Sequence, residues 1–297
     1  LRQAIAIAVD YEEFISIFRN GRGKAAQGPL PVGIFGYTKG PSGINDVVYV
    51  WQHGRATRKP IAVAKQLLKE AGYPNGINPK TGAPLLLTFA AVGNSPDDKA
   101  RFNWLRKQFA KIGLKLNIET TQYNQFQKKI RTGNAQIFDW GWMADYPDPE
   151  NFLFLLYGPN GKVKHGGENA TNYNNKKFDV LFNQIKNMPN GPARQQKIND
   201  ALKIVRHDSP WLWGFHPIDF KLIHQWNNDG KPNVIANNLL KYKFSDGEQR
   251  AQLQKKWNKP ITWPLLVFIG IVLVLLLPLV IAYLVRQRRS SIKRGDT

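Results

Sequence analysis

The sequence predicts an α/β domain followed by one membrane-spanning helix. Helical and strand-type periodicities alternate between residues 60 and 144, a pattern typical of helices packed on both faces of a sheet. Of the 297 residues, 42% are hydrophobic and nine are Trp, which is enough apolar material for a packed core. Residues 261–285 carry no charge. As a helix this run would be about 37 Å long, which exceeds a bilayer core of about 30 Å.

The first part of the chain predicts two short helices and a loop. Residues 1–9 and 11–18 have helical apolar patterns, and Asp10 is placed to cap the second helix. The stretch 21–45 is rich in Gly and Pro and predicts an ordered loop.

The alternation of predicted helices and strands begins at residue 60. Pro60 opens a helix over 60–71, apolar residues recur on one of its faces, and Gly72 ends it. The next predicted elements are a strand at 85–92, a helix at 97–112, a strand at 114–119, a helix at 123–131 and a strand at 136–144.

The elements beyond residue 144 are mostly helical. They are a short helix at 149–157, a polar loop at 158–174, helices at 176–187 and 192–207, and a strand at 211–223. Residues 225–258 are polar and turn-rich, so we expect this segment to pack against another part of the protein rather than to build a core.

Charge and composition exclude several classes of function. The net charge is +21, but outside the C-terminal tail the basic residues are spread as pairs and form no block. Such a charge suggests nucleic acid or anionic lipid as a partner, but spread charge is more often a solvated surface, here facing an anionic membrane. A nucleic-acid-binding module stays a third alternative, and because the domain is placed outside the membrane we expect no nucleic acid as a partner. The absence of cysteine excludes disulfides, thiolate metal sites and cysteine nucleophiles.

No enzyme motif is complete. The Gly-Lys pair at Gly161 and Lys162 lacks the glycine spacing and the hydroxyl of a phosphate loop. The five histidines show no helical i,i+4 pair and no acidic partner for zinc, so we expect no cofactor, no metal and no catalytic residue.

The most concentrated signal is the aromatic segment that begins at Phe138. Period-two alternation would put Phe138, Trp140 and Trp142 on one face of a strand. Asp145 would then stand at the carboxyl end of that strand, beside Trp142 and Tyr146, where α/β sheets bind ligands. Aromatic walls around one carboxylate suit a ligand with an apolar body and a cationic group. An aromatic core strand followed by a capping Asp explains the spacing equally well, and spacing leaves both interpretations open.

Six short motifs occur in a fixed order along the chain. They are LRQAIAIAVDYEE at 1–13, AQGPLP at 26–31, AKQLLKEAGY at 64–73, WMADY at 142–146, the stretch from 148 to 158 and DSPW at 208–211. Together they resemble the extracellular solute-binding proteins of family 5, the oligopeptide-, dipeptide- and nickel-binding components of ABC importers. The resemblance covers residues 1 to about 245. It implies the second lobe of a two-lobed, type II periplasmic-binding-protein-like fold, and a protein that binds without catalysis.

The resemblance also implies roles for the aromatic segment. In that family two lobes close on the ligand, and an Asp in a Trp-x-x-Asp stretch commonly holds the α-amino group of a peptide. Carried over by position, Asp145 takes that role and Trp142 forms a wall of the pocket; Trp140 and Tyr146 complete the predicted ligand-binding set. No arginine precedes Trp142 to receive a peptide carboxylate, so the length and type of the ligand stay open.

The resemblance and the apolar run together predict four regions. Residues 1–224 would be the second lobe, 225–258 a return segment to a first lobe with a linker, 259–285 the transmembrane helix and 286–297 a basic tail. Five basic residues in the tail place it in the cytoplasm and the binding domain outside. No leader sequence begins the chain, so we expect it to be a fragment that lacks its first lobe.

These observations predict the substrate-binding component of an ABC importer, which binds peptides or similar small solutes and delivers them to a permease. The expected partners are the ligand, the ABC permease subunits and membrane lipid through the C-terminal helix. The alternatives are a membrane-tethered ligand sensor or docking protein with the same fold, and a hydrolase that would show turnover of peptides.

Overall fold

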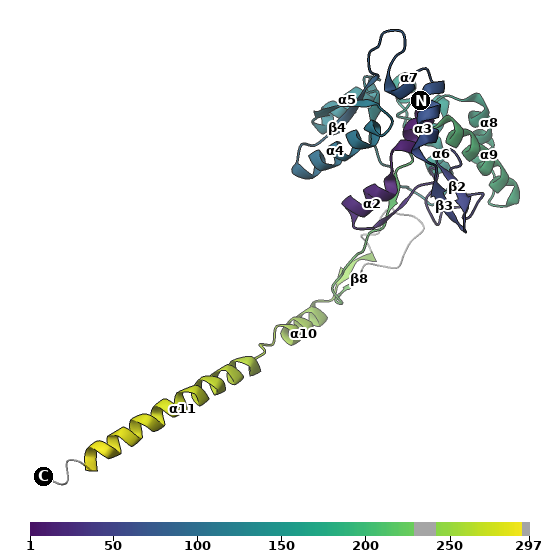
Figure 1. Cartoon of the computed structure of the whole chain (residues 1–297). Coiled ribbons are helices and arrows are strands. Elements are labelled where there is room, and N and C mark those ends of the chain that lie inside the picture. Colours follow the sequence, from purple (N-terminus) through teal and green to yellow (C-terminus); the bar gives the residue numbers. More distant parts are fainter. Residues whose placement is uncertain (229–241, 293–297) are drawn as a thin grey trace. The chain divides into compact units, whose positions relative to one another are not determined.

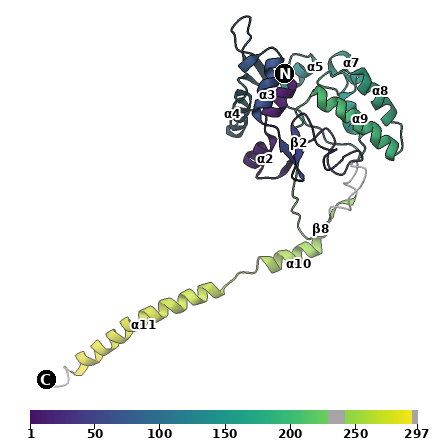
Figure 2. The same ribbon diagram turned by 45° about the vertical axis from the view of Figure 1, so that its right-hand side comes forward.

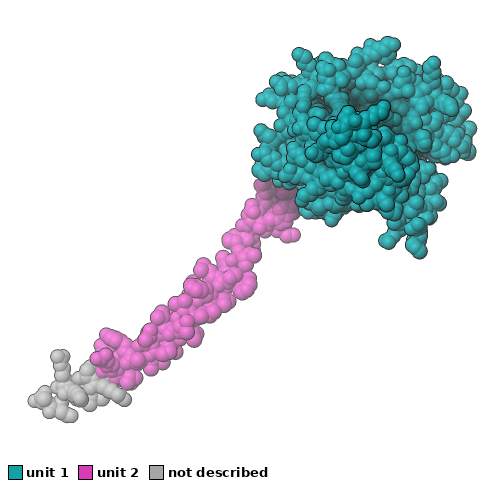
Figure 3. All heavy atoms as spheres, turned by 45° about the horizontal axis from the view of Figure 1, so that its top comes forward, with its two compact units in different colours: residues 1–221, 232–238 teal, residues 222–231, 239–297 magenta. Residues whose placement is uncertain are grey.

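The computed structural model describes residues 1–228 and 242–292, which fall into two compact units. The first unit comprises residues 1–221, and the second comprises the described residues from 222 onward, as coloured in Figure 3. The predicted region bounds at 224, 258 and 285 stay predictions.

The first unit is an α/β domain, as predicted (Figure 1). Its α-helices are α1 (Arg2–Ala8), α2 (Tyr11–Arg19), α3 (Ile61–Glu70), α4 (Pro96–Ala110), α5 (Tyr123–Arg131), α6 (Glu150–Leu153), α7 (Lys162–His165), α8 (Lys176–Ile185) and α9 (Pro192–Asp208). Its 3-10 turns are η1 (Pro74–Gly76), η2 (Phe154–Leu156) and η3 (Gly158–Asn160). Its strands are β1 (Gly23–Ala25), β2 (Tyr49–Gln52), β3 (Arg55–Arg58), β4 (Leu86–Val92), β5 (Lys115–Thr121), β6 (Ile137–Phe138) and β7 (Phe215–Pro217).

A three-stranded parallel sheet organises this unit, in the order β5-β4-β6. The register pairs Leu86 with Lys115 on one side of β4 and Phe89 with Ile137 on the other. Because parallel neighbours need a crossover, α4 connects β4 to β5 and α5 connects β5 to β6. All three strands therefore end at the same edge of the sheet, and the loop after β6 leaves from that edge.

The helix signals of the sequence are confirmed. Asp10 caps α2, since its Oδ1 accepts a hydrogen bond of 3.0 Å from the amide of Glu13. Ser95 and Asp98 form a reciprocal capping box at the start of α4. α8 and α9 lie side by side (Figure 2), and their inner faces build a hydrophobic cluster separate from the one beneath α1 and α3.

Two predicted strands are wrong over most of their length. The strand predicted at 136–144 is limited to Ile137–Phe138, which pairs with β4, and residues 139–144 are irregular backbone. The strand predicted at 211–223 is limited to Phe215–Pro217, which pairs antiparallel with β1 inside the predicted loop 21–45. Pro217 has no amide to donate, and it is the last residue of that strand.

Several smaller elements were not predicted. β2 and β3 form an antiparallel hairpin, and the predicted polar loop 158–174 contains η3 and α7. The second unit contains β8 (Asn227–Asn228), which pairs with β9 (Phe244–Ser245), and α10 (Gly247–Trp257). The polar and turn-rich segment 225–258 thus contains an eleven-residue helix, capped by Asp246, that the sequence analysis did not predict.

The apolar run forms α11 (Trp263–Ile292). Within the described chain it is the one helix whose length and composition suit a membrane span, over Trp263–Arg288, and none of its most apolar window is buried in the protein. It extends past the predicted end at Val285.

Candidate functional site

The loop of residues 139–148 leaves the carboxyl end of β6 and carries the predicted ligand-binding residues. It is mostly irregular backbone. Its aromatic side chains do not share one face, as the predicted strand required. They turn toward different clusters of the first unit.

Trp140 lies on α5 and α7. Its ring is 5.7 Å from the ring of Phe126, and the ammonium of Lys162 stands 5.7 Å above it. Phe126 is buried together with Ile130, and Phe138 packs against them. Trp140 is 39% exposed, so one part of its ring is anchored and the rest is open to solvent or ligand.

Trp142 turns to the other side and packs against the α8–α9 cluster. Its ring meets Phe154 edge-on at 5.3 Å. Its indole Nε1 donates a hydrogen bond of 3.1 Å to the side-chain Oδ1 of Asn151. Trp142 is half-buried and held at its polar end, as a rigid wall requires.

Asn151 fixes the loop, and the sequence reasoning missed it. This side chain is buried, and the same Oδ1 that accepts from Trp142 also accepts from the backbone amide of Asp145 at 3.0 Å. One buried oxygen therefore joins Trp142 to Asp145. The only available signal was an amide amid the apolar residues that follow Pro149, where a buried polar group needs partners.

The carboxylate of Asp145 is exposed, and the structure gives it no hydrogen bond or ion pair among the residues it describes. The backbone of Asp145 is thus held by Asn151, whereas its carboxylate is accessible to a ligand. Beside it, Met143 is 89% exposed and Tyr146 is 43% exposed. The Tyr146 hydroxyl donates to the carboxylate of Glu150. Burial and that hydrogen bond raise the pKa of Tyr146 above its ordinary value.

Asp148 has a structural role. Its Oδ1 accepts from the amide of Glu150 at 2.8 Å, and its two oxygens accept from both terminal nitrogens of Arg194 at 2.8 Å each. The Arg194 side chain is only 4% exposed and also donates to the carbonyl of Ile185. Burial opposes ionisation of Asp148, but the hydrogen bonds from Arg194 and Glu150 outweigh it and lower its pKa.

Asp139 is a second acidic group at the sheet edge. Its side chain is accessible to solvent. The surrounding protein nevertheless raises its pKa, and the positive charge of Arg101 offsets this only in part. Burial, with the charge of Asp139 as a smaller cause, raises the pKa of Tyr11 on α2.

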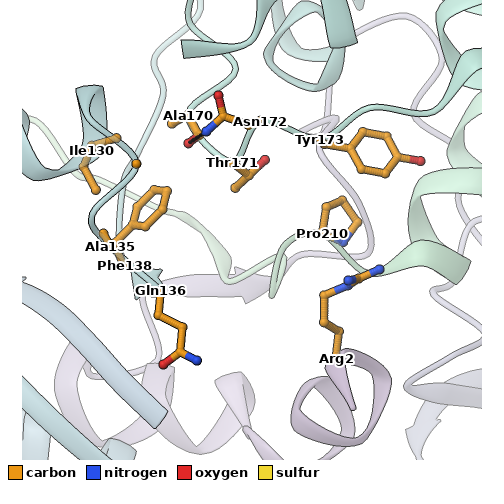
Figure 4. A pocket seen from close by; sticks show the side chains of 11 residues that line it. Arg2, Ile130, Ala135, Gln136, Phe138, Ala170, Thr171, Asn172, Tyr173 and Pro210 are labelled. Atoms are coloured by element: carbon orange, nitrogen blue, oxygen red, sulfur yellow. Dashed lines mark hydrogen bonds between the residues drawn. The ribbon is translucent and has the colours of Figure 1, made fainter. Parts of the chain in front are cut away.

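An open pocket of about 470 Å³ lies next to this loop region (Figure 4). Arg2, Tyr173 and Pro210 line one side of it, and Ile130, Ala135 and Phe138 line the opposite side. None of the four predicted ligand-binding residues lines it. It shares Ile130 and Phe138 with the cluster beneath Trp140, and through that cluster Trp140 is connected to the pocket wall.

The arrangement is suited to binding. Within the described residues no group of three or more His, Cys, Asp or Glu side chains is placed to hold a metal ion. What the loop offers is an open carboxylate on a fixed backbone, flanked by aromatic and thioether side chains. Such a surface favours a ligand with a cationic group and an apolar body.

Comparison with known proteins gives one family. Residues 1–164 match the family model described as bacterial extracellular solute-binding proteins, family 5 Middle. Heme-binding protein A of Haemophilus influenzae is 30% identical over 220 residues, covering 74% of this chain and 37% of that protein. The dipeptide-binding protein of Escherichia coli is 24% identical over 226 residues, covering 76% of this chain and 38% of that protein. The chain therefore spans less than two fifths of the length of these relatives.

Solved structures give the same fold. The periplasmic binding protein DppA of Helicobacter pylori, in complex with the peptide STSA, superposes with a TM-score of 0.62 at 23% identity, covering 82% of this chain and 43% of that one. The oligopeptide-binding protein AppA of Bacillus subtilis, in complex with a nonapeptide, gives a TM-score of 0.62 at 18% identity and covers 82% of this chain and 47% of that one. At these identities the likeness establishes the type II periplasmic-binding fold alone.

Proposed function

Because the chain belongs to the bacterial extracellular solute-binding proteins of family 5, whose model matches more than half of its length, we propose that it forms part of the substrate-binding component of an ABC importer. It binds peptides or similar small solutes outside the membrane and passes them to a permease. Both relatives above are named for binding a ligand rather than for catalysis.

The observation that carries this proposal is the state of Asp145. A carboxylate that is exposed, without a partner in the described chain, and attached to a backbone held by a buried Asn151 oxygen is prepared to receive a cation. The α-amino group of a peptide supplies that cation. A charge-assisted hydrogen bond to it strengthens when water is excluded.

Trp142, Trp140 and Tyr146 surround this contact in the proposal. Trp142 is held by Asn151 and Phe154, so it presents a wall that loses little conformational entropy when a ligand binds. Trp140 and Tyr146 keep 39% and 43% of their surface exposed, and a ligand would cover that surface. Closure of the expected first lobe over the loop would then desolvate the pair formed with Asp145.

The helix α11 gives the proposal its location. We place α11 across the membrane, with the binding domain outside and the basic C-terminal tail in the cytoplasm. Tethering raises the effective concentration of the binding domain at a permease in the same membrane. Lipid contacts of α11 follow from this placement.

Isothermal titration calorimetry tests the site. The protein is expressed from its complete reading frame and titrated with trialanine, with N-acetyl-trialanine, which lacks the amino charge, and with hemin. We expect Asp145→Asn to weaken trialanine binding about 10- to 100-fold, the range for one charge-assisted hydrogen bond. N-acetyl-trialanine should bind weakly to both forms. Asp97→Asn, an exposed carboxylate on α4, is the matched control and should change nothing.

Two outcomes would refute the proposal. Unchanged trialanine affinity in Asp145→Asn removes the role of that residue. Tight hemin binding together with no peptide binding would assign this chain the ligand class named in its Haemophilus relative instead.

A further inference from the structure

The helix α10, which precedes the apolar helix, carries acidic residues at its start and lysines at its end. Asp246 and Glu248 stand at its start, whereas Lys255 and Lys256 stand in its last turn and Lys259 follows two residues after its end. All five side chains are exposed. The positive end is therefore the end that leads into α11.

One face of α10 is fixed to the β8–β9 hairpin. The ring of Trp257 lies 5.3 Å from that of Trp226, which is buried and stacks at 4.1 Å on His224 with an angle of 12° between the planes. The amide of Asp246 donates a hydrogen bond of 2.8 Å to the carbonyl of Trp226. Hairpin and helix form one small folded element, which we call the collar (residues 224–228 and 244–259).

The lysines point away from that packed face. Successive residues of an α-helix are separated by about 100°. Lys255 and Lys256 are therefore turned about 160° and about 100° away from Trp257, in opposite directions. Gln252 lies between these two lysines on the same exposed side of the helix. The aromatic stack thus holds one side of α10 and leaves a basic side free.

This basic side is close to the start of the span. Only three residues lie between Lys259 and Trp263, so the two are at most about 14 Å apart even in a fully extended chain. Trp263 is 65% exposed, as an indole at a headgroup layer would be. Together with Arg250, four basic residues precede the span, against five after it. Basic residues that flank a membrane span are usually retained on the cytoplasmic side, and this rule disfavours the four basic residues placed outside. Their presence there therefore calls for another role.

We propose that the collar docks on an anionic phospholipid surface through Lys255, Lys256 and Lys259. Juxtamembrane lysines gain electrostatic attraction to acidic headgroups within a Debye length of the surface. Docking would set the height and tilt of the chain segment that leads to the binding domain. This inference rests on the proposed placement of α11 in the membrane.

The absence of cysteine makes the test direct. Gln252→Cys introduces a single thiol in the centre of the lysine side, where a nitroxide label reports its exposure to a water-soluble nickel chelate. The labelled protein is reconstituted into vesicles of phosphatidylcholine alone or with 30% phosphatidylglycerol. We expect the accessibility of the label to fall severalfold in the anionic vesicles and to recover in about 0.5 M salt, where the Debye length is only about 4–5 Å.

Two variants separate the collar from general charge effects. The triple substitution Lys255→Gln, Lys256→Gln and Lys259→Gln should abolish the fall. A matched triple substitution of exposed lysines in the first unit, Lys65→Gln, Lys69→Gln and Lys107→Gln, removes the same charge and should preserve it. Equal accessibility in the two kinds of vesicle, or a fall that survives the collar substitutions, would overturn the inference.

Alkaline extraction of the same vesicles distinguishes a failure of the collar proposal from a failure of the membrane placement of α11. If the protein stays in the vesicles at high pH and the accessibility of its label is the same in neutral and anionic vesicles, the docking of the collar is refuted. The membrane placement of α11 is not affected by that outcome. Protein that is released refutes the membrane placement of α11, and the collar proposal with it.

Discussion

Asn151→Leu is the substitution that the site geometry predicts most directly. The Oδ1 of Asn151 accepts from Trp142 Nε1 at 3.1 Å and from the Asp145 amide at 3.0 Å. Leucine keeps the branched shape of the side chain and is somewhat larger, so no cavity forms, and the change removes the acceptor that both donors share. Both donors then lose their partner at a position where Asn151 itself is 3% exposed.

The expected cost follows from the burial of the two donors. A fully buried donor without an acceptor costs about 1–3 kcal/mol. Trp142 is half-buried and Asp145 is exposed, so water compensates in part and each donor falls toward the lower end of that range. We expect a loss of about 2–3 kcal/mol in the free energy of unfolding. For a domain of this size that corresponds to a fall in Tm of about 5–10 °C.

Thermal unfolding followed by near-ultraviolet circular dichroism measures this effect. Asn103→Leu, the same substitution on the exposed side of α4, is the control and should lie within about 0.5 kcal/mol of the unmodified protein. Trialanine affinity should also fall in Asn151→Leu, because the backbone of Asp145 is released. If the two leucine variants melt within 1 °C of each other, about the resolution of such a measurement, the shared acceptor does not hold the loop.

Two further predictions concern acid stability and backbone packing. Hydrogen bonds outweigh burial and lower the pKa of Asp148 and of Asp208, so their stabilising contribution is complete above the unfolded carboxyl pKa of about 3.9 and is lost as the pH falls through the folded values. The urea midpoint should therefore stay level between pH 7 and pH 5 and fall below about pH 4; a midpoint independent of pH down to 3 would contradict this. Gly76→Ala should destabilise the first unit by more than about 2 kcal/mol in urea unfolding, because its Cβ would lie 2.1 Å from the carbonyl oxygen of Gly113 at a φ of +76°. Gly82→Ala has a similar φ of +68° with open space around it and should cost only about 1 kcal/mol, so equal losses would exclude the steric cause.

Helices were predictable where independent local signals agree. Residues 60–71 combine an opening proline, one apolar face and a terminal Gly72, and α3 forms there. The polar helix α10 was missed because it lacks an apolar stripe. What holds it is the contact between Trp226 and Trp257, thirty-one positions apart, which local periodicity does not register.

In the aromatic segment the local pattern predicted a strand that, past Phe138, does not form. Phe138, Trp140 and Trp142 alternate as in a strand, yet Trp140 packs on Phe126 and Trp142 on Phe154. Period-two spacing states which side chains would share a face if a strand formed, but a strand also requires a neighbouring strand for its backbone, and the pairing of β6 with β4 covers only Ile137 and Phe138. The role of Asp145 as a ligand-binding residue stays a prediction, and the Asn151 side chain that holds its backbone was not predicted.

α1, the first helix of the domain, is held by hydrogen bonds to the end of α9, its last helix. Arg2 donates to the carbonyl of Asp208, Gln3 donates to that of His207, and β1 pairs with β7. Contacts between such distant positions close late in folding, because the intervening chain must first be ordered. The contacts that join the two ends of the domain therefore cannot all form until residue 217 has been synthesised. If the chain is exported as proposed, and before residue 217 leaves the ribosome, it would reach the translocation channel without these closing contacts.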